Sequence, residues 1–94
     1  MTRIVLYTTP YCGYCRAAKS LLERKGLSYA EIDVSGDFAK REEMAARAFG
    51  RRMVPQIFID DRHIGGYDEL AQLEREARLD ALLAELEAMP APVP

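Results

Sequence analysis

Two cysteines, Cys12 and Cys15, are the residues of this sequence whose type and spacing best suit chemistry. They lie in the stretch TTPYCGYCRAAKSLL, and a pair at this spacing can be a redox dithiol, half of a metal site or two inert buried thiols. A structural zinc ion takes four ligands, whereas the chain has two Cys and a single His, His63, at no usual zinc-finger spacing. The pattern therefore favours a redox dithiol over an internal zinc site or an inert pair.

The helix expected after the pair gives the two thiols different roles. A helix N-terminus carries unsatisfied N–H groups and the positive end of the helix dipole, so it stabilises a thiolate at Cys12. Cys15 lies one helical turn further on the same face, close enough to form a disulfide. We therefore predict that Cys12 is exposed and attacks as the nucleophile, and that Cys15 is more buried and acts as the resolving thiol.

The hydrophobic pattern around the pair predicts an α/β domain. We expect strands at residues 3–7 and 27–34, and two more that flank a hairpin link at residues 60–62. Helices are expected between the cysteine pair and Gly26, over residues 37–50, and once or twice within residues 67–89. This order begins with a parallel βαβ unit and ends with an antiparallel hairpin before the last helices. One four-stranded mixed sheet with helices on both faces accommodates these elements.

The length of 94 residues predicts one small domain. Its net charge is −2. A nucleic-acid site needs clustered Lys and Arg, which this composition does not suggest, so we expect no nucleic-acid partner. A membrane span needs about 20 consecutive apolar residues, and the apolar runs are far shorter, so we expect no membrane partner. The domain is expected to cover residues 1–88, with residues 89–94 as a disordered Pro-rich tail. The start, MTRIVLYTTP, is typical of a strand and not of a signal peptide, which predicts a cytoplasmic protein. In that reducing compartment a cysteine pair is more often catalytic or metal-binding than structural.

Three motifs, in this order, resemble the glutaredoxin family: CGYC (12–15), MVP (53–55) and GGYDEL (65–70). The resemblance covers residues 2 to about 87 and points to the small bacterial dithiol glutaredoxins. It implies a thioredoxin-like fold and a glutathione-dependent thiol-disulfide oxidoreductase. Such an enzyme reduces protein disulfides and glutathione mixed disulfides, including glutathionylated proteins, through the Cys12/Cys15 dithiol, with glutathione as the reductant. The composition of the chain suits a monomer.

The resemblance also implies a glutathione site, formed by Tyr14, Met53, Val54, Pro55, Gly66, Tyr67 and Asp68. A cis-Pro55 would leave the Val54 N–H and C=O free to pair with the cysteinyl part of glutathione, as a β-strand does. The glycines of GGYDEL would allow close approach, and the next helix would offer N–H donors at Tyr67 and Asp68 to the γ-glutamyl carboxylate. The Asp68 carboxylate would accept from the ammonium group of the ligand, cap the helix, or do both.

Other side chains near the motifs have weaker signals. Tyr14 would pack on the ligand backbone, and Tyr11 would shield the thiolate. Arg51 and Arg52 would supply positive charge to the glycyl carboxylate, although exposed loop arginines are usually only solvated. His63 is expected to be a hairpin side chain and not a base, because a helix-activated thiolate needs none.

Two departures from the family pattern bear on these contacts. Relatives often carry a Lys where this chain has Thr8 and Thr9, so charge near the thiolate must come from Arg16, Lys19 or the arginine pair. Met53 stands where relatives have Thr, which removes a hydroxyl and keeps the backbone contacts.

A third departure, Gly13 in place of the usual Pro, keeps a different function open. A [2Fe–2S] cluster needs four ligands, which two chains would supply as Cys12 and one glutathione each, in a dimer that forms only around the cluster. This cluster-binding alternative would make the protein a carrier or sensor. A third hypothesis is a thioredoxin-like hydrogen donor served by a flavoprotein reductase, and the GGYD segment argues against it.

Overall fold

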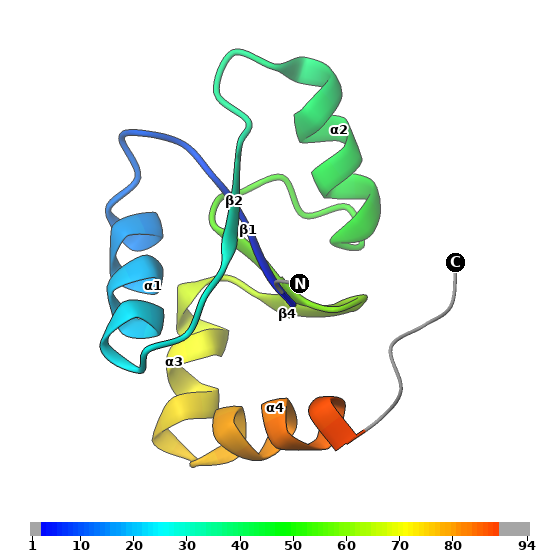
Figure 1. Ribbon diagram of the computed structural model, residues 1–94. Helices are drawn as coiled ribbons and strands as arrows, with labels where there is room; N and C mark the ends of the chain where they lie inside the picture. The colour runs from blue at the N-terminus through cyan, green and yellow to red at the C-terminus, as the bar shows by residue number, and fades with distance from the viewer. Residues whose placement is uncertain (1–2, 89–94) are drawn as a thin grey trace.

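The computed structural model describes residues 3–88, which form four strands and four helices (Figure 1). In chain order the elements are β1 (Ile4–Thr8), α1 (Gly13–Arg24), β2 (Ala30–Asp33), α2 (Phe38–Arg47), β3 (Gln56–Ile59), β4 (Arg62–Gly65), α3 (Tyr67–Arg75) and α4 (Arg78–Ala88). The tail predicted at residues 89–94 and the first two residues lie outside the described residues.

The strands form one mixed sheet in the order β2-β1-β3-β4. β1 pairs in parallel with β2 and antiparallel with β3, and β3 pairs antiparallel with β4. The predicted fold class, a four-stranded mixed sheet with helices on both faces, is confirmed. In the β1–β3 register, Tyr7 lies opposite Gln56. The end of β1, which leads to the cysteine pair, therefore lies beside the start of β3, which follows Pro55.

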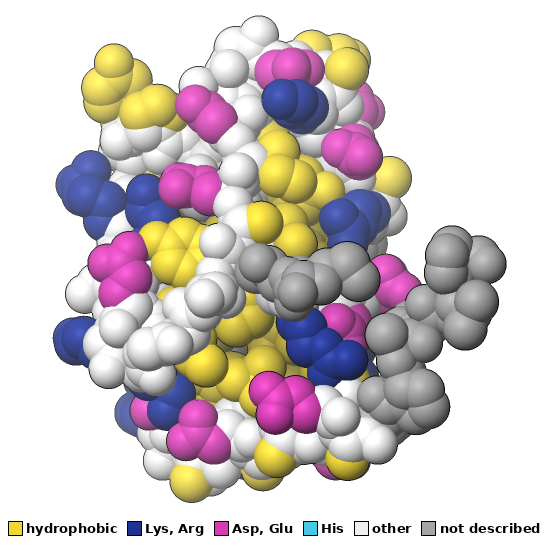
Figure 2. Space-filling view, in the orientation of Figure 1, with side chains coloured by type: hydrophobic (Ala, Val, Ile, Leu, Met, Phe, Trp, Pro, Cys, Tyr) yellow, Lys and Arg dark blue, Asp and Glu magenta, His cyan; other side chains and the backbone are white. Residues whose placement is uncertain are grey.

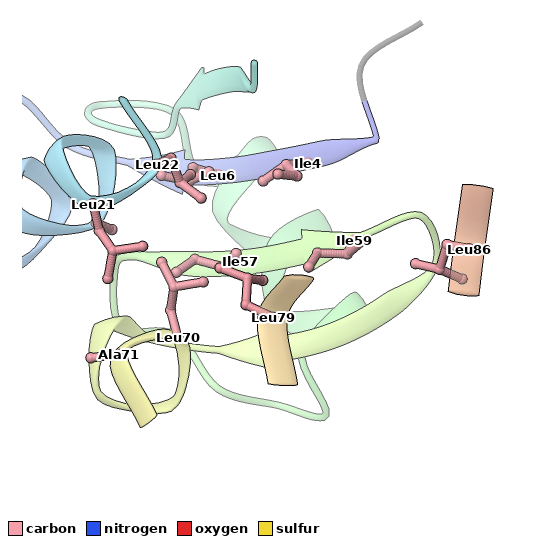
Figure 3. Close-up of a cluster of buried hydrophobic side chains, with 11 residues drawn as sticks. Ile4, Leu6, Leu21, Leu22, Ile57, Ile59, Leu70, Ala71, Leu79 and Leu86 are labelled. Carbon is pink, nitrogen blue, oxygen red and sulfur yellow. The ribbon is translucent and has the colours of Figure 1, made fainter. Parts of the chain in front are cut away.

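Two hydrophobic clusters hold helices against the two faces of the sheet. Successive side chains of a strand point to opposite faces, and the central strands follow this rule. Leu6 and Ile57 enter the cluster formed with α1, α3 and α4 (Figure 3), whereas Tyr7 and Phe58 pack with Met44 of α2. Figure 1 shows α2 on the side of the sheet away from α3. Burial of these apolar side chains on both faces is the main stabilising contribution and fixes where the strand ends meet.

Several predicted boundaries differ from the structure: β1 covers Ile4–Thr8 instead of residues 3–7, and the strand expected over residues 27–34 is shorter, Ala30–Asp33. Two further differences have a cause in the backbone. The helix expected over residues 37–50 ends at Arg47, because Phe49 has a φ of 58° and Gly50 a φ of 88°, which an α-helix cannot include. The hairpin link is one residue shorter than predicted, because Arg62 already pairs with Ile59 in β4. In both places a backbone conformation, and not the hydrophobic pattern, decides where the element ends.

Charged side chains of both signs are interspersed on the face that Figure 2 shows, in keeping with the net charge of −2. Hydrophobic side chains show between the charged ones on the same face. Among the helices of residues 3–88, none is long and apolar enough to cross a membrane.

Candidate active site

The two cysteines lie at the start of α1. Cys12 is the N-cap residue, and its Sγ accepts a hydrogen bond from the Cys15 N–H at 3.0 Å. Cys12 is half-buried, whereas only 1% of Cys15 is exposed, and both are free thiols. The backbone donor and the helix dipole both favour negative charge on the Cys12 sulfur. Cys12 thus offers an accessible sulfur, with the buried thiol of Cys15 behind it.

Cys15 is held as a neutral thiol. The pKa of Cys15 is raised to about 12, first by burial and then by the hydrogen bond with Cys12 and the charge of Cys12, while the Thr9 backbone and Lys19 act in the opposite direction. A buried sulfur loses solvation when it ionises, which is why burial is the largest cause. At neutral pH Cys15 therefore keeps its proton.

The segment that faces Cys12 ends in a cis peptide bond, between Val54 and Pro55. The Cys12 Sγ lies 3.7 Å from the Val54 carbonyl oxygen, within reach of an S–H donor. Within residues 3–88, the Val54 N–H donates to no backbone carbonyl group. The backbone of Val54 thus borders the thiol and presents an unused donor, as an extended peptide ligand would need.

A pocket of about 160 Å³ opens beside this segment. All seven residues that the sequence predicts for a glutathione site line it, together with three others: Tyr14, Met53, Val54, Pro55, Gly66, Tyr67 and Asp68, with Arg51, Gln56 and Glu69. These residues come from α1, the loop before β3, β3 itself and the start of α3. The fold therefore brings four separated segments around one cavity next to the Cys12–Val54 contact.

A family model described as Glutaredoxin matches residues 4–64. The chain belongs to the glutaredoxin family. It is 51% identical over 83 residues to Glutaredoxin 3 of Escherichia coli (strain K12), covering 88% of this chain and 99% of that protein. A solution structure of glutaredoxin from Brucella melitensis is 49% identical with a TM-score of 0.76, covering 88% of this chain and 89% of that one. A crystal structure of a buckwheat glutaredoxin-glutathione complex has a TM-score of 0.79 at 32% identity, covering 94% and 82%.

Membership of this family makes the chain a glutathione-dependent thiol oxidoreductase, and the predicted recognition is confirmed. Neither the geometry nor the comparisons favour the iron–sulfur alternative. Among residues 3–88 no group of three or more His, Cys, Asp or Glu is placed to hold a metal ion. A cluster that uses one thiolate from each chain would need no such group, so this finding bears only on metal sites within one glutaredoxin chain.

Aromatic side chains form one wall of the glutaredoxin pocket. Tyr14 and Tyr67 stack with ring centroids 6.2 Å apart and an interplanar angle of 30°. Tyr14 is 66% exposed and Met53 is 77% exposed, so both offer apolar surface to a ligand. Tyr11 is 94% exposed, and a ring so open to solvent does not shield the thiolate as the sequence suggested.

Glu69 is a pocket residue that the sequence analysis missed. Its Oε1 accepts from the Gly66 N–H at 2.7 Å and from Arg51 Nη2 at 3.1 Å. The Gly66 N–H, followed by Arg51, lowers the pKa of Glu69, so the side chain is a carboxylate at neutral pH. The available signal was its position, the third residue of α3, which is the usual Glu position of a capping box. Glu69 thus joins the loop before β3 to the start of α3 across the pocket.

The two adjacent arginines have separate environments. Arg51 lines the pocket and pairs with Glu69, whereas Arg52 pairs with Glu42 of α2 and lies over the Phe38 ring. Arg51, and not Arg52, is therefore placed to meet an anionic ligand group.

The other predicted sources of charge do not line the pocket. Lys19 pairs with Glu31 at 3.0 Å, and the same Glu31 Oε2 accepts from the Thr8 hydroxyl at 2.7 Å. Thr8 and Lys19 thus both bind Glu31 of the neighbouring strand β2. His63 lies in β4, where its ring contacts Gln56, and burial followed by the charge of Arg51 lowers the pKa of His63. Its ring is therefore neutral at pH 7, and it contacts neither thiol.

Proposed function

We propose that this glutaredoxin reduces glutathione mixed disulfides and protein disulfides, with Cys12 as the nucleophile and Cys15 as the resolving thiol. One observation carries the proposal. All seven residues expected to bind glutathione line one pocket, and the carbonyl oxygen of one of them, Val54, is 3.7 Å from the Cys12 sulfur. The buckwheat glutaredoxin is described in complex with glutathione, which supports the same ligand here.

The chemistry is two successive thiol–disulfide exchanges. The Cys12 thiolate attacks the glutathionyl sulfur of a mixed disulfide, the S–S bond breaks, and the released thiolate takes up a proton. A glutathione thiolate then attacks the Cys12–glutathione disulfide, which restores Cys12 and forms glutathione disulfide. With a protein disulfide, the Cys12 thiolate attacks one substrate sulfur, the substrate S–S bond breaks, and the other sulfur leaves as a thiolate that takes up a proton. Cys15 then loses its proton, attacks the Cys12 sulfur and displaces the bound substrate sulfur, which takes up a proton in turn. Two glutathiones reduce the Cys12–Cys15 disulfide and are oxidised to glutathione disulfide.

The pocket offers a partner for each part of glutathione. The Val54 N–H and C=O would pair with the cysteinyl residue, and the N–H groups at the start of α3 would bind the γ-glutamyl carboxylate. The Asp68 carboxylate would accept from the ligand's ammonium group, and Arg51 would bind the glycyl carboxylate. Tyr14 would pack against the peptide backbone of the ligand.

We further propose that the enzyme works in the cytoplasm as a monomer. Glutathione keeps that compartment reducing, which returns the dithiol to its starting state after each turnover. One chain holds both thiols and the complete pocket, so the proposed reaction needs no second copy. Its protein partners would be disulfide-bonded and glutathionylated proteins.

The experiment that tests the cysteine roles compares Cys12→Ser and Cys15→Ser in a glutathione-coupled assay. The substrates are a glutathionylated peptide and a peptide with an internal disulfide. Cys12→Ser should abolish turnover of both, whereas Cys15→Ser should retain turnover of the glutathionylated peptide and lose most activity on the internal disulfide. Equal loss in both variants on both substrates would contradict the division of roles.

The ligand assignment is tested by Asp68→Asn, with Asp61→Asn in the hairpin link as the matched control. Loss of a charge-assisted contact to the ammonium group should raise KM for the glutathionylated peptide by about tenfold. Asp61 lies outside the pocket, so its variant should match the parent protein. Gly66, and not Asp68, is the N-cap residue of α3, so the capping role expected for Asp68 is wrong. No change in KM for Asp68→Asn would contradict the proposed ammonium contact.

A further inference from the structure

Gln56 is a buried polar side chain whose amide is bonded at both ends. It follows the cis-proline, and only 1% of it is exposed. Its Nε2 donates to the Met53 carbonyl oxygen at 2.8 Å, and its Oε1 lies 2.7 Å from Nε2 of His63. A buried amide left without partners would be strongly destabilising, so a fully bonded one in this place holds its neighbours in a defined arrangement.

The partners of Gln56 fix which atom donates and which atom accepts in each of these hydrogen bonds. A carbonyl oxygen only accepts, so the amide NH2 of Gln56 must face Met53 and its oxygen must face His63. His63 therefore donates from Nε2. Its ring is held by Phe58 at 5.1 Å and Phe49 at 5.7 Å between centroids, which limits its rotation. The imidazole of β4 thus braces the amide that binds the loop before β3.

The Met53–Val54 peptide unit transmits this restraint to the pocket. In a planar trans peptide the C=O and the following N–H point in opposite directions. Within residues 3–88 the only cis peptide bond is the following one, between Val54 and Pro55, so the Met53–Val54 bond is trans. The Met53 C=O and the Val54 N–H therefore point in opposite directions. Gln56 binds the Met53 oxygen on the buried side, and the Val54 N–H is consequently directed away from the interior, on the side where Val54 lines the pocket.

We propose that Gln56, braced by His63, is a positioning residue that aims the Val54 N–H at glutathione. The inference rests on the proposed function, because it assigns a cause to the orientation of a donor in that pocket. Gln56 acts through the backbone of Met53 and Val54, and it touches neither thiol.

The test compares substrates with and without glutathione. Gln56→Met keeps the side-chain length and removes both hydrogen bonds, whereas Gln56→Glu keeps an acceptor for His63 and removes the donor to Met53. His63→Leu removes the brace, and His63→Gln restores a donor. Gln72→Met, on the surface of α3, is the matched control. The assays are steady-state kinetics on a glutathionylated peptide and the single-turnover rate with hydroxyethyl disulfide, which contains no glutathione.

The two Gln56 variants should raise KM for the glutathionylated peptide by roughly tenfold, with kcat and the hydroxyethyl disulfide rate changed less than twofold. His63→Leu should raise KM about threefold, and His63→Gln should return it toward the parent value. Parallel losses in both assays would show a merely structural role and overturn the inference. An unchanged KM in the Gln56 variants would overturn it as well.

A second measurement applies if the Gln56 variants do not fold. Glutathione is titrated into ¹⁵N-labelled parent protein and His63→Leu, and the amide signal of Val54 is followed. The parent signal should shift on binding, and a several-fold weaker response is expected in His63→Leu. An equal response in both would refute the brace. A parent protein whose pocket signals do not respond to glutathione would instead refute the proposed function, which keeps the two failures distinguishable.

Discussion

The raised pKa of Cys15 leads to a quantitative prediction about alkylation. With a pKa of about 12, roughly one Cys15 side chain in 30,000 is a thiolate at pH 7.5. An ordinary exposed thiol with a pKa of about 8.5 is roughly one-tenth ionised at the same pH. The thiolate is the reactive form, but a thiolate of higher pKa is intrinsically more nucleophilic, by roughly 30-fold over this pKa difference. Cys15 should therefore react about a hundred-fold more slowly than an exposed thiol. In Cys12→Ser the hydrogen bond and charge of Cys12 are lost, but burial, the largest cause, remains.

The assay is the rate of iodoacetamide alkylation of Cys12→Ser, with N-acetylcysteine as the reference thiol and mass spectrometry of the modified peptide as the readout. Burial favours the neutral thiol, so the rate should rise about tenfold per pH unit through pH 7–10 without a plateau. Cys15→Ser is the matched control, because its remaining thiol is half-buried and should react readily at pH 7.5. If Cys12→Ser reacts within tenfold of the reference thiol at pH 7.5, burial does not control the resolving thiol and the reasoning is refuted.

Three further substitutions test the fold around the site. Leu79→Ala removes a fully buried side chain of α4 and should lower the free energy of unfolding by about 2–5 kcal/mol in urea denaturation. Gly65 has a φ of 120°, and an added Cβ would lie 2.3 Å from Glu69 Oε1. Gly65→Ala should therefore lower the midpoint of urea denaturation more than the control Gly36→Ala, because φ at Gly36 is also positive but its surroundings are open. Gly13→Pro should keep the fold and raise the free energy of unfolding by about 0.4–1 kcal/mol, because Pro suits the first residue of a helix; a lower thermal midpoint would contradict this.

Local signals predicted most of the fold, whereas the residues of the pocket were predicted from the resemblance to glutaredoxins. Helix and strand periods, the cysteine spacing and the glycine pair each act within a few residues, so they can be read along the chain. The parts that were missed depend on which way a side chain points in the folded protein. Arg51 and Arg52 are neighbours in sequence, yet one enters the pocket and the other packs on α2. Gln56 contacts His63 and Glu69 contacts Arg51, each on another segment of the chain. No sequence pattern predicts these two contacts.

Gly13 has a different physical meaning in the structure from the one its sequence suggested. The iron–sulfur alternative depends on Gly13 in place of the usual Pro, and in the structure Gly13 is the first residue of α1. Cys12 before it has φ −95° and ψ 113°, the extended conformation that a residue before Pro also adopts, so glycine is not required for this backbone. What glycine adds is an N–H at the helix N-terminus, where donors have no partner within the helix. The backbone N–H that contacts the Cys12 sulfur is that of Cys15, so Gly13 gives no reason of its own to prefer a cluster to disulfide exchange.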